Sequence, residues 1–182
     1  MVFEVTIQHV FKFSWLYVTR THLTKYPTEK EEMVMKMDTV EENMGKHRRK
    51  DSDGVQYKRR IAVCRNILPA IFKRIPVLNE ESILLEEECW YNAESEIMKV
   101  KSRNLTWQDY ANAWEESEFM RCPNNPSWTL FDQRGGIELK YSGVIARMVE
   151  MFVHSYVKSN SWKAVHVMEK LLEERAEVIN TK

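Results

Sequence analysis

Two groups of glutamates, at residues 86–88 and 115–118, are the side chains best suited to acid–base or metal chemistry. Paired carboxylates could act as general acid and base or hold Mg²⁺. In a strand, however, Glu86 and Glu88 share one face while Glu87 points to the other. An inward glutamate needs a cationic partner, which a lysine or arginine on a neighbouring strand would supply. We therefore favour structural ion pairs over catalysis.

Other catalytic patterns are missing from the sequence. It contains no GxSxG, HExxH or GxGxxG motif and no Walker phosphate loop, and its five histidines lack the spacing of a metal-binding set. Cys64, Cys89 and Cys122 form no CxxC pair, which argues against a disulfide framework or a zinc knuckle and favours a reducing or redox-neutral compartment. We predict no catalytic residue, no metal site and no cofactor, and hence a protein that is not an enzyme.

Cations gather in two segments that could contact an anionic surface. The run KHRRK at residues 46–50 is open to three interpretations: a nuclear-import signal, a contact for an anionic surface, or a solvated hairpin tip. Residues 66–76, NILPAIFKRIP, place Lys73 and Arg74 beside an apolar face. That face consists of Ile67, Leu68, Ile71, Phe72 and Ile75. Such an insert is either a loop that covers the core or an amphipathic lid that enters the headgroup region of a membrane.

The hydrophobic pattern predicts the elements that position these residues. Alternating apolar side chains predict strands at residues 2–10 and 33–42. Further strands are expected at residues 55–64, 82–91, 96–102, 109–120 and 128–140, with turn residues in the gaps between them. Ser14 is expected to cap a helix over 15–25, and an apolar stripe predicts helix from 144 to 176, unless Ser159-Asn160-Ser161 kinks it. Strands that follow one another without helices imply an antiparallel meander, and Gly135-Gly136 suggests a bulge or a bend in the last strand. We therefore expect an α+β fold.

Length and charge exclude further classes. The chain has 182 residues, and 27 lysines and arginines balance 27 aspartates and glutamates. This predicts one domain over residues 1–176 with a short tail at 177–182, and a zero net charge argues against a nucleic-acid binder. No apolar run approaches the roughly 18 residues of a membrane span, and residues 1–5 show no signal or transit pattern.

A series of short motifs, in order and spacing, resembles the PRELI-domain (slowmo) family. They are Lys25-Tyr26-Pro27, Asp38-Thr39-Val40, Asp53-Gly54, Lys58-Arg59-Arg60-Ile61, Pro69, Trp128-Thr129, Ser159-Asn160-x-x-Lys163 and Met168-Glu169. No one motif is specific, but together they cover nearly the whole chain.

The resemblance implies a carrier of phosphatidic acid or phosphatidylserine in the mitochondrial intermembrane space. Its fold would be START-like: a curved sheet of about seven strands, a short early helix, a lid loop and a long C-terminal helix around a hydrophobic cavity. The lid would be the insert that contains Ile67, Leu68, Ile71, Phe72, Lys73 and Arg74, and would contact anionic membranes. The partners implied are the phospholipid and a small twin Cys-x9-Cys helical protein, with no nucleic acid.

The resemblance also assigns a headgroup site. Lys25, Arg60 and Lys163 would bind the phosphate, with Asn160 as a neutral donor. Other family members carry lysines where this chain has Cys64 and Ile67, which argues for a weaker preference for phosphatidic acid. A lipid-sensing or scaffold domain that does not transfer lipid is the alternative.

Overall fold

The computed structural model describes residues 2–43, 54–140, 143–160 and 162–180. It has seven strands: β1 (Val2–Phe11), β2 (Val34–Asn43), β3 (Val55–Arg65), β4 (Ser82–Asn92), β5 (Ile97–Asn104), β6 (Ala111–Cys122) and β7 (Asn125–Leu139). The helices are α1 (Trp15–Thr24), α2 (Val144–Asn160) and α3 (Lys163–Asn180), with two 3-10 turns, η1 (Phe72–Arg74) and η2 (Pro76–Leu78). The predicted α+β class is confirmed, and every predicted strand is present.

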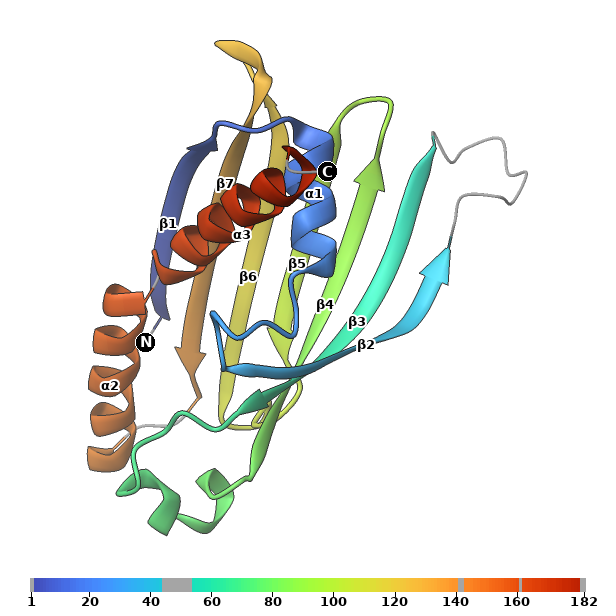
Figure 1. Ribbon diagram of the computed structural model, residues 1–182. Helices are drawn as coiled ribbons and strands as arrows, with labels where there is room; N and C mark the ends of the chain where they lie inside the picture. The colour runs from blue at the N-terminus through green and yellow to red at the C-terminus, as the bar shows by residue number, and fades with distance from the viewer. Residues whose placement is uncertain (1, 44–53, 141–142, 161, 181–182) are drawn as a thin grey trace.

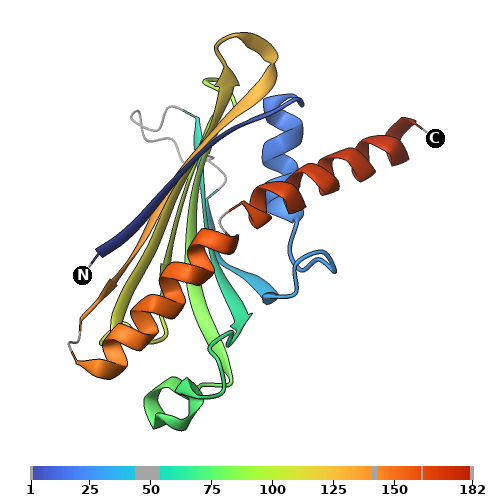
Figure 2. The ribbon, with the colours of Figure 1, turned by 90° about the vertical axis from the view of Figure 1, so that its left-hand side faces the viewer.

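The strands form a single antiparallel sheet in the order β1-β7-β6-β5-β4-β3-β2. Strands β2 to β7 follow one another as a meander, and β1 completes the sheet by pairing with β7 along its whole length. The sheet curves strongly, and the helices lie on its concave side (Figures 1 and 2).

Helices α1 and α3 cover one half of the concave face and build the core there. Trp15 donates its indole N–H to the carbonyl of Phe119 at 3.0 Å, and the Tyr17 hydroxyl donates to the carbonyl of Leu172 at 2.9 Å. Buried side chains of the sheet pack against both helices, including Ile7, Phe11, Met98, Phe119 and Phe131. The main buried core of the described residues therefore lies in this half of the molecule.

The convex face carries a network of ion pairs. Glu86 pairs with Arg59 and Arg103, and Glu116 pairs with Lys101 and Arg134. These cations hold the pKa values of Glu86 and Glu116 below their usual range. Structural ion pairing is thus confirmed for both glutamates.

The C-terminal apolar stripe is divided into two helices, α2 and α3, which run in different directions (Figure 1). The kink considered at residues 159–161 is therefore a break. Helix α3 also continues to Asn180, past the expected domain end at residue 176. The basic run at residues 46–50 lies outside the described residues.

Two smaller expectations concern Ser14 and the Gly135-Gly136 pair. Ser14 occupies the N-cap position of α1, as expected, although its side chain makes no capping hydrogen bond. Gly135 and Gly136 stay in register with β1 and β6 and form no bulge. A Cβ on Gly136 would lie 2.9 Å from the carbonyl oxygen of Phe3 and 2.9 Å from Trp114 Nε1. Glycine is needed here because two neighbouring groups approach its backbone closely.

Candidate functional site

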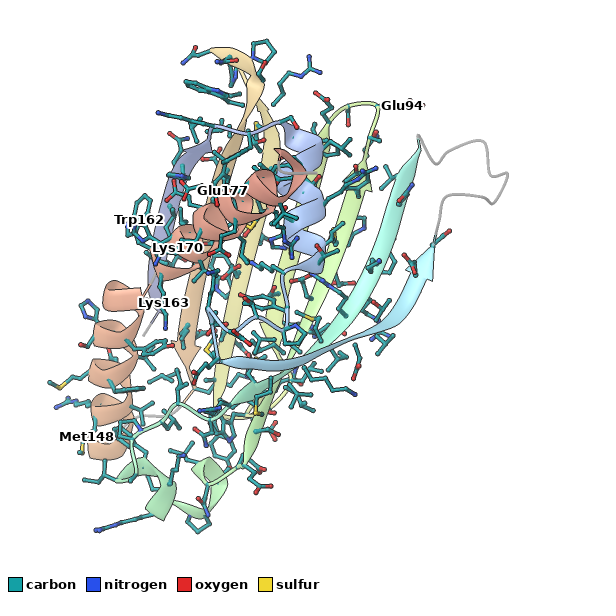
Figure 3. All side chains as sticks on the ribbon, in the orientation of Figure 1. Glu94, Met148, Trp162, Lys163, Lys170 and Glu177 are labelled. Carbon is teal, nitrogen blue, oxygen red and sulfur yellow. The ribbon has the colours of Figure 1, made fainter. Side chains whose placement is uncertain are left out.

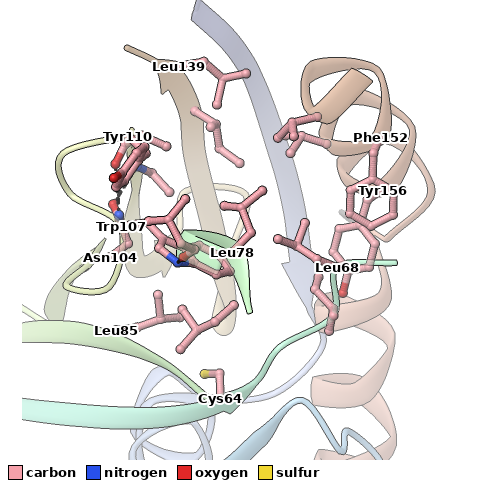
Figure 4. Close-up of a pocket in the computed structure, with 18 of the residues that line it drawn as sticks. Cys64, Leu68, Leu78, Leu85, Asn104, Trp107, Tyr110, Leu139, Phe152 and Tyr156 are labelled. Carbon is pink, nitrogen blue, oxygen red and sulfur yellow. Dashed lines mark hydrogen bonds between the residues drawn. The ribbon is translucent and has the colours of Figure 1, made fainter. Parts of the chain in front are cut away.

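A cavity of ≈480 Å³ lies between the concave face, α2 and the β3–β4 connection (Figure 4). Its lining is mostly aliphatic and aromatic and comprises Met33, Cys64, Arg65, Ile67, Leu68, Ile75, Val77, Leu78, Ile83, Leu85, Asn104, Trp107, Tyr110, Ala111, Ala113, Ile137, Leu139, Val149, Phe152, Val153 and Tyr156. Its volume falls within the range of about 300–1,000 Å³ that is typical of ligand pockets. Burial raises the pKa of the Cys64 thiol to about 11, so this lining group stays neutral.

Residues 66–81 form the roof of this cavity, and we call this segment the lid. Leu68 and Phe72 are buried, and the Phe72 ring lies 6.0 Å from the Phe152 ring of α2. Asn66 fixes both ends of the lid, because its side-chain amide donates to the carbonyls of Leu78 at 3.0 Å and Glu80 at 2.8 Å. Hydrogen bonds and one aromatic contact thus hold the lid closed.

The outer face of the lid is different in character. Ile71 is 56% exposed, Arg74 is exposed, and Lys73 donates to the carbonyl of Asn66 at 3.3 Å. Met148 and Met151 of α2 are also exposed at the same end of the molecule, where Figure 3 labels Met148. The lid therefore covers the cavity with one face and offers an apolar and basic surface with the other. Membrane contact through that surface stays a prediction.

A second hollow of ≈220 Å³ continues the cavity along the sheet. It shares Leu85, Asn104, Ala113 and Ile137 with the larger cavity and adds Ser102 and Glu115, among others. Glu115 is exposed, and its side chain borders this hollow. Desolvation raises the pKa of its carboxyl, although nearby Lys25 acts against that shift.

Charged side chains gather at this inner end. Arg60 is buried and donates to Glu87 Oε1 from both Nε and Nη2, while its Nη1 donates to the Leu23 carbonyl at 2.8 Å. Burial lowers the pKa of Lys25, and the nearby charge of Arg60 lowers it further. The carboxylates of Glu87, Glu115 and Glu31 raise the pKa and so offset part of the decrease. Among the described residues no carboxylate lies within ion-pair distance of Lys25 Nζ, which sits 4.7 Å from the centre of the Tyr26 ring. Arg65 is the one charged residue in the described lining of the larger cavity, and the other charges lie beyond its inner end.

His22 completes this cluster as a neutral ring. Its Nε2 atom is buried, has no hydrogen-bond partner in the described chain, and lies 4.0 Å from Glu87 Oε2. Burial, with smaller contributions from Lys25 and Arg60, lowers the pKa of His22 well below its usual value. His22 therefore remains uncharged in the folded protein at neutral pH.

Replacing His22 with phenylalanine should flatten the acid side of the pH–stability curve. The folded state keeps His22 neutral, whereas the unfolded chain binds a proton below about pH 6.5, so stability falls as pH falls. The loss approaches about 1.4 kcal/mol per pH unit until folded His22 is protonated. Thermal unfolding of both proteins between pH 7.5 and 5 measures this. If stability fell equally steeply with pH in both proteins, a neutral His22 in the folded state would be contradicted.

Among the expected headgroup residues whose side chains are described, the structure brings Lys25 and Arg60 together. Lys163 is exposed at the start of α3 (Figure 3). Asn160 ends α2, and its side chain lies outside the described part of the chain. Sequence reasoning missed Glu115 and His22 as members of this cluster. The alternation of β6 could have found Glu115, because it shares a face with Ala113 and the buried Phe119.

Comparisons with known proteins show the family of the chain and the class of its fold. A sequence model of the PRELI-like family matches residues 17–178. The protein slowmo homolog of Dictyostelium discoideum is 26% identical over 164 residues, covering 90% of this chain and 68% of the relative.

Similar solved structures include the Zhui aromatase/cyclase of Streptomyces sp. R1128, with a TM-score of 0.63, 10% identity, and coverage of 97% of this chain and 96% of that chain. A START superfamily protein of Mycobacterium smegmatis gives a TM-score of 0.52 and 14% identity, with coverage of 94% and 97%. These likenesses place the fold in the START-like class. No described helix has the length and apolar character needed to cross a bilayer.

Proposed function

The chain belongs to the PRELI-like family, and on that premise we propose that it transfers phosphatidic acid or phosphatidylserine between mitochondrial membranes. It would act in the intermembrane space without catalysing a reaction, together with a small twin Cys-x9-Cys helical protein. The observation that carries the proposal is the roofed apolar cavity with charged residues beyond its inner end.

The physics of lipid extraction explains why such a cavity is useful. Burial of one methylene is worth about 0.8 kcal/mol, so two acyl chains with about 28 methylenes are held in a bilayer by about 20 kcal/mol. A carrier must offer the chains comparable apolar surface, which the aliphatic and aromatic lining supplies. The phosphate needs a cation in addition, and Lys25 is the cluster cation that no carboxylate pairs with directly in the described chain.

Opening of the lid would admit the lipid. The Phe72–Phe152 contact joins the lid to α2, and separating those rings would widen the gap between them. Exposed Ile71 and Met151 would insert into the headgroup region while Arg74 pairs with anionic lipids. Docking and opening are thereby coupled through one short segment.

Replacing Ile71 with serine should slow transfer about tenfold without lowering the melting temperature, because one exposed apolar anchor worth about 1.5–3 kcal/mol is lost. Transfer of fluorescent lipid between liposomes measures the rate. Leu16→Ser on α1 is a matched control, since Leu16 is 42% exposed away from the lid. Equal slowing by both variants would reject a docking role for the lid.

The proposal is tested by mixing the full chain with donor vesicles that carry fluorescent phosphatidic acid or phosphatidylserine and with unlabelled acceptors. We expect transfer to rise with protein concentration, with and without the helical partner. Lipid binding without any transfer would favour a lipid-sensing or scaffold role instead. Absence of binding as well would contradict the proposed function.

A further inference from the structure

The two 3-10 turns of the lid are held in different ways, so we divide the lid into an η1 half (residues 69–75) and an η2 half (residues 76–81). The Phe72 ring of the η1 half contacts the Phe152 ring of α2, with centroids 6.0 Å apart. In the η2 half, the indole N–H of Trp107 donates to the Val77 carbonyl at 2.7 Å. Within the described chain, the η2 half is thus hydrogen-bonded to a segment outside the lid, whereas the hydrogen bonds of the η1 half stay inside the lid.

Trp107 lies in the connection between β5 and β6 and has an unusual backbone conformation. Its φ angle is 65°, in the left-handed region that bulky side chains rarely adopt. Its carbonyl accepts from the backbone N–H groups of Tyr110 and Ala111 at 2.8 and 2.9 Å. Strain of this kind persists where the surrounding contacts over-determine it, often at ligand clamps and switches. The strained residue here is the one whose side chain holds the lid.

The loop that presents Trp107 is firmly held. Asn104 is 7% exposed at the end of β5, and its side-chain amide donates to the carbonyls of Thr106 at 2.7 Å and Ala111 at 3.0 Å. Its Oδ1 accepts from the Ala113 backbone N–H at 2.7 Å. The Thr106 hydroxyl accepts from the Leu84 N–H of β4 at 2.9 Å. These bonds tie the base of the indole to the sheet.

Trp107 and Leu78 both belong to the cavity lining (Figure 4). The η2 half is therefore joined to the cavity wall at the residue that forms part of that wall. An apolar ring contact such as Phe72–Phe152 can be exchanged for contact with an acyl chain at little cost. Breaking the indole hydrogen bond would instead leave the Val77 carbonyl without its donor. The two halves should therefore open with different ease.

We propose that Trp107 is a positioning residue that holds the η2 half on the cavity wall while the η1 half opens, so that lipid enters between η1 and α2. This rests on the proposed lipid-transfer function and assigns the fixed and the moving part of the lid. Exposed Ile71 and Arg74 belong to the η1 half, so membrane docking would act on the part that is free to move. The η2 half would keep the rest of the cavity covered.

Hydrogen–deuterium exchange of the full chain, read by mass spectrometry, tests the anchor without a ligand. After correction for intrinsic rates, we expect the η2 half to exchange at least about tenfold more slowly than the η1 half, because its opening breaks the indole bond. Trp107→Phe keeps an aromatic ring in the wall but lacks the N–H donor, and should remove most of that difference. Trp107→Gly is the second variant, since glycine adopts a positive φ without strain, and should have the same effect.

Trp90→Phe is the matched control, because Trp90 lies on the same convex face of β4 as Glu86, with its ring 5.5 Å from that of Tyr57. It should leave the exchange of both halves unchanged. Equal exchange of the two halves in the unmodified protein, or an unchanged difference in the folded Trp107 variants, would overturn the anchor.

Release of lipid gives a second readout. Full chains loaded with tail-labelled phosphatidylserine are mixed with acceptor vesicles, and the loss of label from the protein is followed. Trp107→Phe should release the lipid about tenfold faster than the unmodified protein and Trp90→Phe, because its whole lid is loosened. Release at the unmodified rate would overturn the role of Trp107. Failure of the unmodified protein to load lipid would contradict the proposed function, while the exchange comparison would still decide whether Trp107 anchors the lid.

Discussion

Replacing Ala113 with tryptophan should reduce lipid uptake about a hundredfold while leaving the protein folded. Ala113 lines both the large cavity and the smaller hollow, so an indole at this position would occupy the passage between them. The indole would take the space of about four methylenes of the acyl chain. Losing their burial weakens the free energy of lipid binding by about 3 kcal/mol, which is about a hundredfold in affinity. The added ring enters empty space, so it should not force apart a packed core.

The measurement is liposome transfer together with thermal unfolding of the same preparation. Asn112→Trp adds the same side chain one residue earlier on β6, where Asn112 is exposed on the opposite face. This control should transfer lipid at the normal rate. Normal transfer by Ala113→Trp, with the melting temperature preserved, would show that lipid does not use this space.

Replacing Arg60 with methionine should destabilise the fold by about 3–5 kcal/mol, because it leaves the Glu87 carboxylate buried without its partner. For a chain of this size the melting temperature should fall by about 6–20 °C. The Leu23 carbonyl near the end of α1 also loses its donor. Differential scanning calorimetry at pH 7 measures the change.

A second variant separates structure from ligand binding. Arg60→Met combined with Glu87→Leu removes both charges and should recover most of the lost stability, since an apolar pair of similar volume often replaces a buried ion pair. If Arg60 served chiefly to bind phosphate, the single variant would lose transfer at an unchanged melting temperature. That result would contradict the structural role described here.

Local chemistry was sufficient to predict most of the fold. Alternating apolar and polar residues in VFEVTIQHV predict the first strand, and the absence of helical segments between the later strands predicts the antiparallel meander. The break between α2 and α3 was only a possibility in sequence, because Ser159-Asn160-Ser161 permits either a kink or an interruption. Tertiary packing decides between the two.

The site was less predictable, because it depends on pairings between distant strands. The sequence shows Arg60 as one of three consecutive cations, and only the β3–β4 register places it opposite Glu87. Residues Arg59 and Arg60 look alike in sequence, yet Arg59 lies on the convex face with Glu41 and Glu86 while Arg60 is buried. Likewise, Glu115 and Glu116 are neighbours that differ only in the face of the sheet they occupy.

Native mass spectrometry of the purified full chain, gently desolvated and then fragmented to release any bound lipid, tests the central claim most directly. A cavity that carries phospholipid should yield a complex heavier than the chain by the mass of one glycerophospholipid, whose headgroup fragment contains a phosphate. The Ala113→Trp protein prepared in parallel should be free of that mass. Recovery of the folded, unmodified chain with no bound phospholipid, even after incubation with vesicles, would contradict the account.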